Sequence, residues 1–170
     1  AFAGCEMSVI KALLLTDVVD STRLAEELGD SAMAEVWAAH DRVSRALLVR
    51  WRGREIDKTD GMLLLFDNCA DAVGYAMEYH PALAALSTPI VARAGLHVGP
   101  VTLRENAPDD IARGAKPLEV EGLAKPITAR VMALARGGQT LLSAAVREAL
   151  GTCAHKLVSH GHWRIKGVSD

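Results

Sequence analysis

The chain has 170 residues, half of them hydrophobic and 24% charged, with a formal net charge of −2 at pH 7. This length suits one domain with a sizeable core, and no apolar run approaches the roughly 20 residues of a membrane-spanning helix. A nearly balanced charge without a basic block argues against general nucleic-acid binding. The cysteines Cys5, Cys69 and Cys153 are widely spaced and lack metal-site spacing, which predicts reduced thiols in a cytoplasmic protein.

The first predicted strand is the apolar run 13–15, which ends at Asp17 and turns through residues 20–22 into a helical pattern. A buried strand that leads into a helix N-terminus in this way favours phosphate binding. Residues 24–51 carry apolar side chains at helical spacing, broken at residues 29–30, and so predict two consecutive helices.

A second carboxylate follows in a predicted hairpin. Residues 54–66 surround a Thr59-Asp60-Gly61 turn, with Ile56 before it and the apolar run 62–66 after it, which predicts a hairpin that places Asp60 at the tip. Asp17 alone is compatible with a helix N-cap and Asp60 alone with a turn residue. Two carboxylates at adjacent strand ends, beside a helix start that favours phosphate, instead suit a divalent cation and a nucleoside triphosphate.

Residues 70–86 predict another helix, with Pro81 marking a kink or break. Two strands are predicted at about 91–98 and 101–105. Residues 105–121 are rich in Asn, Pro, Asp and Gly and predict a loop.

Toward the C-terminus, the sequence predicts a helix over residues 127–135. A further predicted helix is capped by Ser143 and runs to Leu150. Strand pairs that alternate with amphipathic helices predict an α+β fold in which helices pack on a sheet.

In order and spacing, these motifs resemble the catalytic domain of the class III adenylate and guanylate cyclases. Besides the two aspartate motifs, the resemblance rests on residues 93–101, 129–135, 138–143 and 162–168. It implies a ferredoxin-like sheet with helices packed on it. It also implies a cyclase domain over residues 9–170 that lacks the family's last strand, an N-terminal extension or cloning remnant at 1–8, and further domains in the full-length protein.

The resemblance also implies a site. Asp17 and Asp60 would bind two divalent ions, Mg²⁺ or Mn²⁺, and Arg130 matches the arginine that stabilises charge on the phosphate in the transition state. A helix-surface arginine usually makes only a solvated ion pair, which is the competing interpretation of Arg130. Asp20 is interpreted as the N-cap of the following helix. The backbone amides expected to bind phosphate are those of Val18, Val19, Ser21 and Thr22.

Purine recognition departs from the family pattern. Where the family's adenylate cyclases place a lysine and an aspartate, this chain has Ile56 and Glu119. Ile56 can only pack against a ring, whereas Glu119 can accept from an exocyclic amine. Lys58 lies two residues before Asp60, and the sequence leaves open whether it pairs with Asp60 or reaches phosphate.

Pro126 replaces a family asparagine that lies one helical turn before Arg130. Proline has no donor to offer in its place. We expect Pro126 to open the helix at its first position and to leave the amides of Ile127 and Thr128 free.

The resemblance implies a homodimeric cyclase with shared active sites that makes a 3',5'-cyclic nucleotide, with ATP favoured as the substrate and GTP as the alternative. The alternative is a degenerate cyclase-homology module that binds nucleotide or dimerises and regulates a downstream domain. Pro126 and Ile56 favour that module, whereas Asp17, Asp60 and Arg130 favour the enzyme. A plain ferredoxin-like interaction domain would require the aspartates to be accidental.

Overall fold

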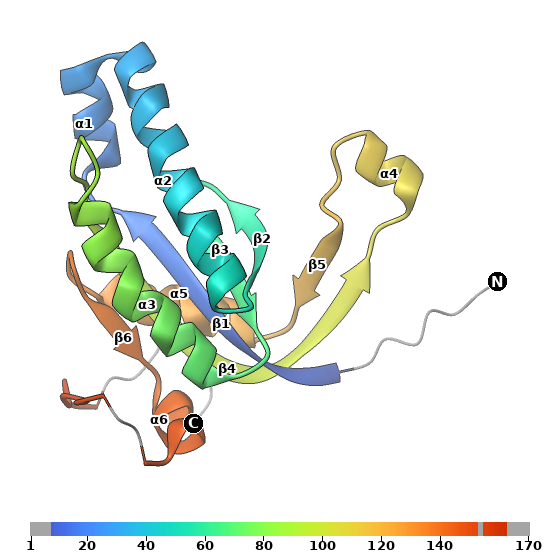
Figure 1. Cartoon of the computed structure of the whole chain (residues 1–170). Helices are drawn as coiled ribbons and strands as arrows, with labels where there is room; N and C mark the ends of the chain where they lie inside the picture. Colours follow the sequence, from blue (N-terminus) through green and yellow to red (C-terminus); the bar gives the residue numbers. More distant parts are fainter. Residues whose placement is uncertain (1–7, 153–154, 163–170) are drawn as a thin grey trace.

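The structure is a computed structural model that describes residues 8–152 and 155–162. Strands and helices are interleaved along these residues (Figure 1). Their bounds in chain order are β1 (Ser8–Val18), α1 (Ser21–Leu28), α2 (Asp30–Arg50), β2 (Arg54–Lys58), β3 (Met62–Phe66), α3 (Cys69–Ala84), β4 (Ala92–Glu105), α4 (Pro108–Ala112), β5 (Leu118–Glu121), α5 (Ala124–Leu134), β6 (Thr140–Leu142) and α6 (Ala144–Leu150).

The sheet has the strand order β2-β3-β1-β4-β5, and β6 pairs with β4 beside this path. All neighbours are antiparallel except β6, which runs parallel to β4. The central pair is β1 with β4, in register from Ser8 opposite Thr102 to Val18 opposite Ala92. The first four strands form the ferredoxin-like arrangement. Helices α1 and α2 connect β1 to β2, and α3 connects β3 to β4. The predicted α+β fold class is therefore confirmed.

Side chains of the strands alternate between two cores, one on each face of the sheet. Leu14 and Leu64 belong to the core that α2 and α3 cover. Leu13 and Leu63 belong to the core on the opposite face, which includes Ala124 at the start of α5. The strands therefore read as continuous apolar runs, since helices cover both faces.

Helix α5 lies directly against β4. A Cβ atom added to Gly95 would be 2.3 Å from the backbone nitrogen of Met132, so no larger residue fits there. This close contact fixes α5, and with it Arg130, relative to the centre of the sheet.

The structure differs from the predicted elements in β4, which is one strand rather than two. Along the edge away from β1, β4 pairs with β6 at residues 94–96 and with β5 at residues 102–105. Pro100 lies between these segments, where that edge has no partner strand, and a proline is tolerated there. The predicted loop 105–121 contains α4 and β5, which extend to one side of the molecule (Figure 1).

Pro81 lies inside α3 and does not break it. Proline removes the bond to the carbonyl four residues earlier, here that of Met77. Met77 is 56% exposed, so water can reach this turn of the helix. The two helices predicted within residues 24–51 are confirmed as α1 and α2.

Helix α6 begins after Ser143, as predicted, but the Ser143 hydroxyl makes no capping bond and instead pairs with His97 Nδ1 at 2.8 Å. Cys69 is buried and free. Within residues 8–152 and 155–162, no helix is both long and apolar enough to cross a membrane. Cys5, Cys153 and nearly all of the motif at residues 162–168, on which part of the resemblance rests, lie outside the described residues.

Candidate functional site

The end of β1 and the turn between β2 and β3 bring Asp17 and Asp60 together. The Val18 amide donates to the Asp60 carbonyl at 2.7 Å. A Cβ atom on Gly61 would lie 1.9 Å from the Thr16 carbonyl oxygen and 2.9 Å from the Asp17 Cα. Only glycine allows the turn to lie so flat on β1, and this contact places Asp60 beside Asp17.

Both aspartates have partners that a cation could displace or share. Asp17 Oδ2 accepts from Arg93 Nε at 3.0 Å, and Arg93 Nη1 also donates to the Ala133 carbonyl at 3.3 Å. Asp60 Oδ2 accepts from the Ser21 hydroxyl at 3.3 Å. The Asp17 side chain is 31% exposed, so its carboxylate is accessible to a ligand.

These carboxylates fit Mg²⁺ or Mn²⁺ bound together with a triphosphate. Mg²⁺ in nucleotide sites usually takes one or two protein carboxylates and completes its shell with phosphate oxygens and water. In the described part of the chain, no group of three or more His, Cys, Asp or Glu residues could hold a metal by itself. Asp17 and Asp60 therefore suit a metal that arrives with nucleotide.

Two of the four amides predicted to bind phosphate already donate hydrogen bonds to backbone carbonyls, so the prediction is wrong for Val18 and Val19. The Val18 amide bonds to Asp60, and the Val19 amide donates to the Val91 carbonyl at 2.8 Å. Residues at a strand end keep donating within the sheet, so only Ser21 and Thr22, at the start of α1, remain as candidates.

Asp20 occupies the N-cap position of α1, but its side chain makes no capping bond. Its backbone is left-handed, with φ of 55°, and its carbonyl accepts from the Leu24 amide at 2.9 Å. The carboxylate is therefore not the cap that the sequence predicts.

Arg130 lies in α5, and its Nη1 atom is buried without a hydrogen-bond partner in the described residues. A buried guanidinium donor without an acceptor is costly unless an anion or another chain supplies one. Within residues 8–152 and 155–162, no hydrogen bond or ion pair joins Arg130 to Asp17 or Asp60.

Helix α5 begins at Ala124, so Pro126 is its third residue rather than its first. The Ile127 amide donates to the Leu123 carbonyl at 3.1 Å. The prediction that Ile127 would be free is therefore wrong, because the helix starts earlier than its pattern suggests. Pro126 itself is exposed.

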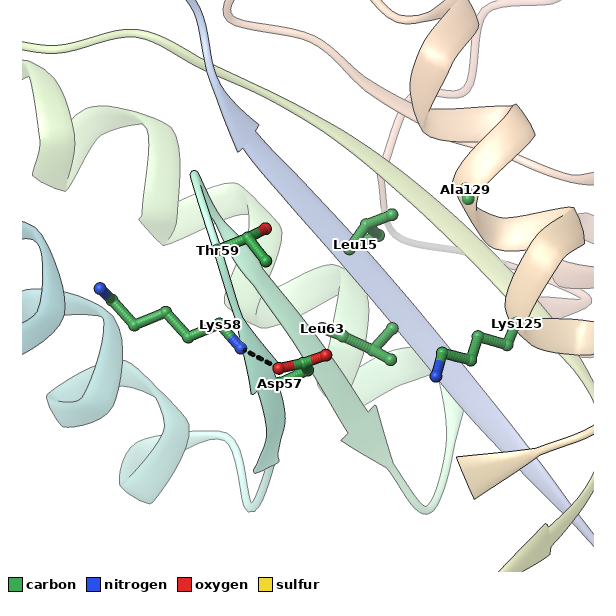
Figure 2. A pocket seen from close by; sticks show the side chains of 7 residues that line it. All are labelled: Leu15, Asp57, Lys58, Thr59, Leu63, Lys125 and Ala129. Atoms are coloured by element: carbon green, nitrogen blue, oxygen red, sulfur yellow. Dashed lines mark hydrogen bonds between the residues drawn. The ribbon is translucent and has the colours of Figure 1, made fainter. Parts of the chain in front are cut away.

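A cavity of about 130 Å³ lies between the β2–β3 hairpin and α5 (Figure 2). Asp57 contributes the acidic group of its wall and Lys125 a basic one. Asp57 Oδ2 lies 2.6 Å from Lys116 Nζ, and its Oδ1 accepts from the Lys58 amide at 2.9 Å. Burial alone would raise the pKa of Asp57, but the hydrogen bonds from Lys116 and Lys58 and the charges of Lys116 and Lys125 lower it. The remaining lining residues are Leu15, Lys58, Thr59, Leu63 and Ala129.

A β-bulge explains why Asp57, and not Ile56, lines this cavity. Glu55 is opposite Leu64 and Asp57 is opposite Leu63, which leaves Ile56 as an extra residue. Ile56 is 6% exposed and packs in the same core as Leu63. The bulge turns both residues toward one face of the sheet. Asp57 is not predicted from the sequence as a cavity residue, because β2 carries four charged residues around Ile56 and nothing in this pattern distinguishes Asp57 from its neighbours.

Lys58 and Glu119 each pair with another side chain of this chain. Lys58 Nζ is 3.3 Å from Asp41 Oδ2 and 5.3 Å from the ring centroid of Trp37, both in α2. Figure 2 shows its side chain extending away from the cavity. Lys58 thus pairs with Asp41 rather than with Asp60, although it is one of the residues that line the cavity. Glu119 Oε1 accepts from Asn106 Nδ2 at 3.4 Å and does not line the cavity.

No protein-family model matches this sequence, and no curated protein matches it. Solved structures do. The guanylyl cyclase Cya2 is 22% identical with a TM-score of 0.85, covering 97% of this chain and 89% of that one. An adenylate cyclase from Trypanosoma brucei is 21% identical with a TM-score of 0.81, covering 95% and 84%.

The guanylate cyclase domain of RhGC from Catenaria anguillulae, solved in complex with GTP, is 15% identical with a TM-score of 0.76, covering 85% and 84%. These similarities extend over 85% to 97% of this chain. The chain therefore has the fold of the class III adenylate and guanylate cyclase catalytic domains.

Proposed function

We propose that this domain is a purine nucleotide cyclase that forms a 3',5'-cyclic nucleotide and pyrophosphate in cyclic-nucleotide signalling, with ATP favoured over GTP. The observation that carries the proposal is the placement of Asp17 beside Asp60, through the 2.7 Å bond from the Val18 amide to the Asp60 carbonyl. On this fold, the pair suits metal-assisted attack of a ribose hydroxyl on a phosphate.

Asp17 and Asp60 would hold two Mg²⁺ or Mn²⁺ ions, which when bound activate the 3'-hydroxyl and neutralise the triphosphate. Ser21 and Thr22 would donate their backbone amides to phosphate oxygens at the start of α1. Arg130 would donate to the charge that develops on the α-phosphate, for which its buried Nη1 has a free donor. Asp57 and Glu119 would be the acceptors available to the exocyclic amine of adenine.

We further propose that a second copy of the chain completes each site. The two aspartates and Arg130 are not bonded to each other within the described residues of one chain. A symmetric dimer would place the Arg130 of one subunit against the aspartates of the other and form two equivalent sites.

The competing proposal is a regulatory module that has lost catalysis. The ion pair of Arg93 with Asp17, at 3.0 Å, supports it because the guanidinium already neutralises a carboxylate that the metals need. Pro126, which has no donor in place of the family's asparagine, supports it as well.

The deciding experiment is to incubate the purified domain with ATP or GTP and Mn²⁺ or Mg²⁺ and to assay cyclic product by mass spectrometry. We expect Asp17→Asn and Asp60→Asn to reduce turnover by about 10³-fold or more, because each removes a metal-binding charge. Asp67→Asn is the matched control, since Asp67 is 80% exposed and pairs with Lys11 outside the site.

Full activity in either site variant would contradict the metal assignment. If wild-type protein forms no product but still binds nucleotide in a calorimeter, the regulatory module replaces the enzyme as the better proposal.

A further inference from the structure

Lys58, the last residue of β2, binds to two side chains of α2. Its Nζ atom lies 3.3 Å from Asp41 Oδ2 and 5.3 Å from the ring centroid of Trp37. Trp37 and Asp41 are four residues apart on one helix, so they share a face of α2. A carboxylate and the face of an indole ring both attract an ammonium group. The Lys58 side chain is 31% exposed and that of Asp41 18%, so water and salt screen this pair less than a surface ion pair.

The two side chains that bind Lys58 are themselves held by a buried histidine. His40 has no exposed surface. Its Nδ1 atom is 3.0 Å from Asp41 Oδ1, and its ring packs edge-on against Trp37 with centroids 5.5 Å apart. Burial lowers the pKa of His40, so the ring is neutral there and donates from Nδ1, because a carboxylate can only accept. One oxygen of Asp41 is thus bonded within α2, and the other lies against Lys58.

Lys58 lies beyond an interruption in the pairing of β2. The bulge at Ile56 breaks the register with β3, so Asp57 and Lys58 are the two residues of β2 between the bulge and the turn at residues 59–61. Asp57 bonds to Lys116, in the segment before β5. The Lys58 side chain instead extends away from the cavity, to α2 (Figure 2). Lys58 therefore connects to α2 the strand end from which the turn begins.

The turn itself carries Asp60 and is bonded to β1. Within the turn, the Thr59 amide donates to the Gly61 carbonyl at 2.9 Å, and the Val18 amide of β1 donates to the Asp60 carbonyl at 2.7 Å. The Asp60 carboxylate is exposed and accepts from the Ser21 hydroxyl at 3.3 Å, which is a long hydrogen bond. The backbone of the turn therefore determines where this carboxylate lies, and β1 and α2 hold that backbone from two sides.

We propose that Lys58 is a positioning residue, which binds Asp41 and Trp37 of α2 and thereby holds the turn at residues 59–61, with Asp60, against the end of β1. The consequence for metal binding rests on the proposed function. A lysine that reached the nucleotide phosphates would act without Asp41. A lysine that merely added an ion pair would stabilise the whole fold without controlling local opening of this turn.

Four variants separate these roles. Lys58→Met keeps a flexible apolar stem over Trp37 and removes the ammonium, whereas Asp41→Asn removes the charge of its partner. Lys58→Arg is the conservative variant, because it retains the positive charge and can lie over an aromatic ring. Glu55→Gln is the matched control. Glu55 accepts from Arg45 Nε of α2 at 2.8 Å, so this ion pair joins the same two elements on the other side of the bulge.

The first measurement is hydrogen exchange of the Val18 and Thr59 amides relative to that of Leu14, without metal or nucleotide. Leu14 pairs with strands on both sides and reports opening of the whole sheet. We expect Val18 and Thr59 to exchange about threefold to fivefold faster relative to Leu14 in Lys58→Met and in Asp41→Asn, as for loss of one partly buried ion pair. The double variant should exchange no faster than either single variant, because both remove the same contact. Lys58→Arg and Glu55→Gln should exchange like wild type.

Three results of this measurement would overturn the proposal. The first is unchanged relative exchange of Val18 and Thr59 in folded Lys58→Met. The second is equal acceleration in the control Glu55→Gln, which would show that any ion pair between α2 and β2 has this effect. The third is a double variant in which the two single effects add, because Lys58 would then act independently of Asp41.

The second measurement is Mn²⁺ affinity by electron paramagnetic resonance, with an ATP analogue that cannot be cyclised. Lys58→Met and Asp41→Asn should weaken Mn²⁺ binding severalfold and equally, relative to Glu55→Gln. Faster exchange with unchanged Mn²⁺ affinity would overturn the role in placing Asp60. Weaker binding of the analogue without metal in Lys58→Met, but not in Asp41→Asn, would assign Lys58 to phosphate instead. If wild type binds no Mn²⁺, the proposed function fails, while the exchange data still test whether Lys58 holds the turn.

Discussion

Individual contacts at Asp17 and Asp60 decide what their carboxylates can do. Arg93 neutralises Asp17 and also bonds to the Ala133 carbonyl, so it connects β1 to the end of α5. The positive charge of the Arg93 guanidinium also offsets part of the repulsion between the two carboxylates. Arg93 is thus part of the geometry of the site and a competitor of its ligand.

Position 61 of the site has no room for a side chain larger than that of glycine. We expect Gly61→Ala to lower the free energy of unfolding by about 1–3 kcal/mol, because the new Cβ would overlap the backbone of β1 and force the turn away. Urea unfolding measures the change. Gly99→Ala is the control, since its Cβ would come no closer than 3.2 Å to a side-chain atom of His97. Equal stability of Gly61→Ala and wild type would contradict the close packing of this turn.

Among the elements, α5 and the bulged strand β2 shape the cavity between them. The bulge in β2 turns Asp57 toward α5, whose Lys125 contributes positive charge there. Helix α5 begins two residues before Pro126. Pro126 therefore lies in the first turn of the helix, where a proline costs no hydrogen bond. The helix is therefore stable with Pro126, and what this residue lacks is only a donor.

We expect Pro126→Asn to raise cyclase turnover. Loss of one preorganised donor typically costs about 10²- to 10³-fold in rate, so restoring one should recover part of that factor. Pro126 is exposed, and the substitution should leave the fold intact. The measurement is turnover at saturating nucleotide and Mn²⁺. Pro126→Ala removes the ring without adding a donor, so an equal gain in that variant, or no gain in Pro126→Asn, would contradict the explanation.

At the scale of the whole molecule, the candidate groups come from different elements. Asp17 lies at the end of β1 and Asp60 in the turn between β2 and β3, whereas Arg130 lies in α5 with a buried Nη1 that has no partner among the described residues. The proposed second copy would complete the site most simply as a symmetric partner.

Mixing Asp17→Ala with Arg130→Ala should therefore restore activity that neither variant has alone. About a quarter of wild-type turnover is expected, because half of the dimers would be heterodimers and each would carry one intact site. The assay compares the mixture with each parent at equal total concentration. An inactive mixture, from parents that fold and dimerise, would contradict the shared site.

Much of this architecture follows from local patterns. Apolar runs and helical spacing place β1, the helices α1 and α2, and the hairpin with Asp60 near its tip, since these elements depend on neighbours a few residues away. The order of the elements also predicts the ferredoxin-like sheet, which the strand order confirms. The assignment of a domain to residues 9–170 and the roles of Ser21, Thr22 and Arg130 stay predictions.

Other features depend on contacts between distant segments, which no local pattern contains. The amides of Val18 and Val19 are occupied because residues 60 and 91 meet the end of β1. Lys58 pairs with Asp41 because α2 lies beside β2. Asp57, rather than Ile56, lines the cavity because of the bulge in β2. Such hydrogen-bond partners and side-chain directions are determined only when the sheet and the helices pack together. A buried polar group must then bond to whichever group the tertiary structure places next to it.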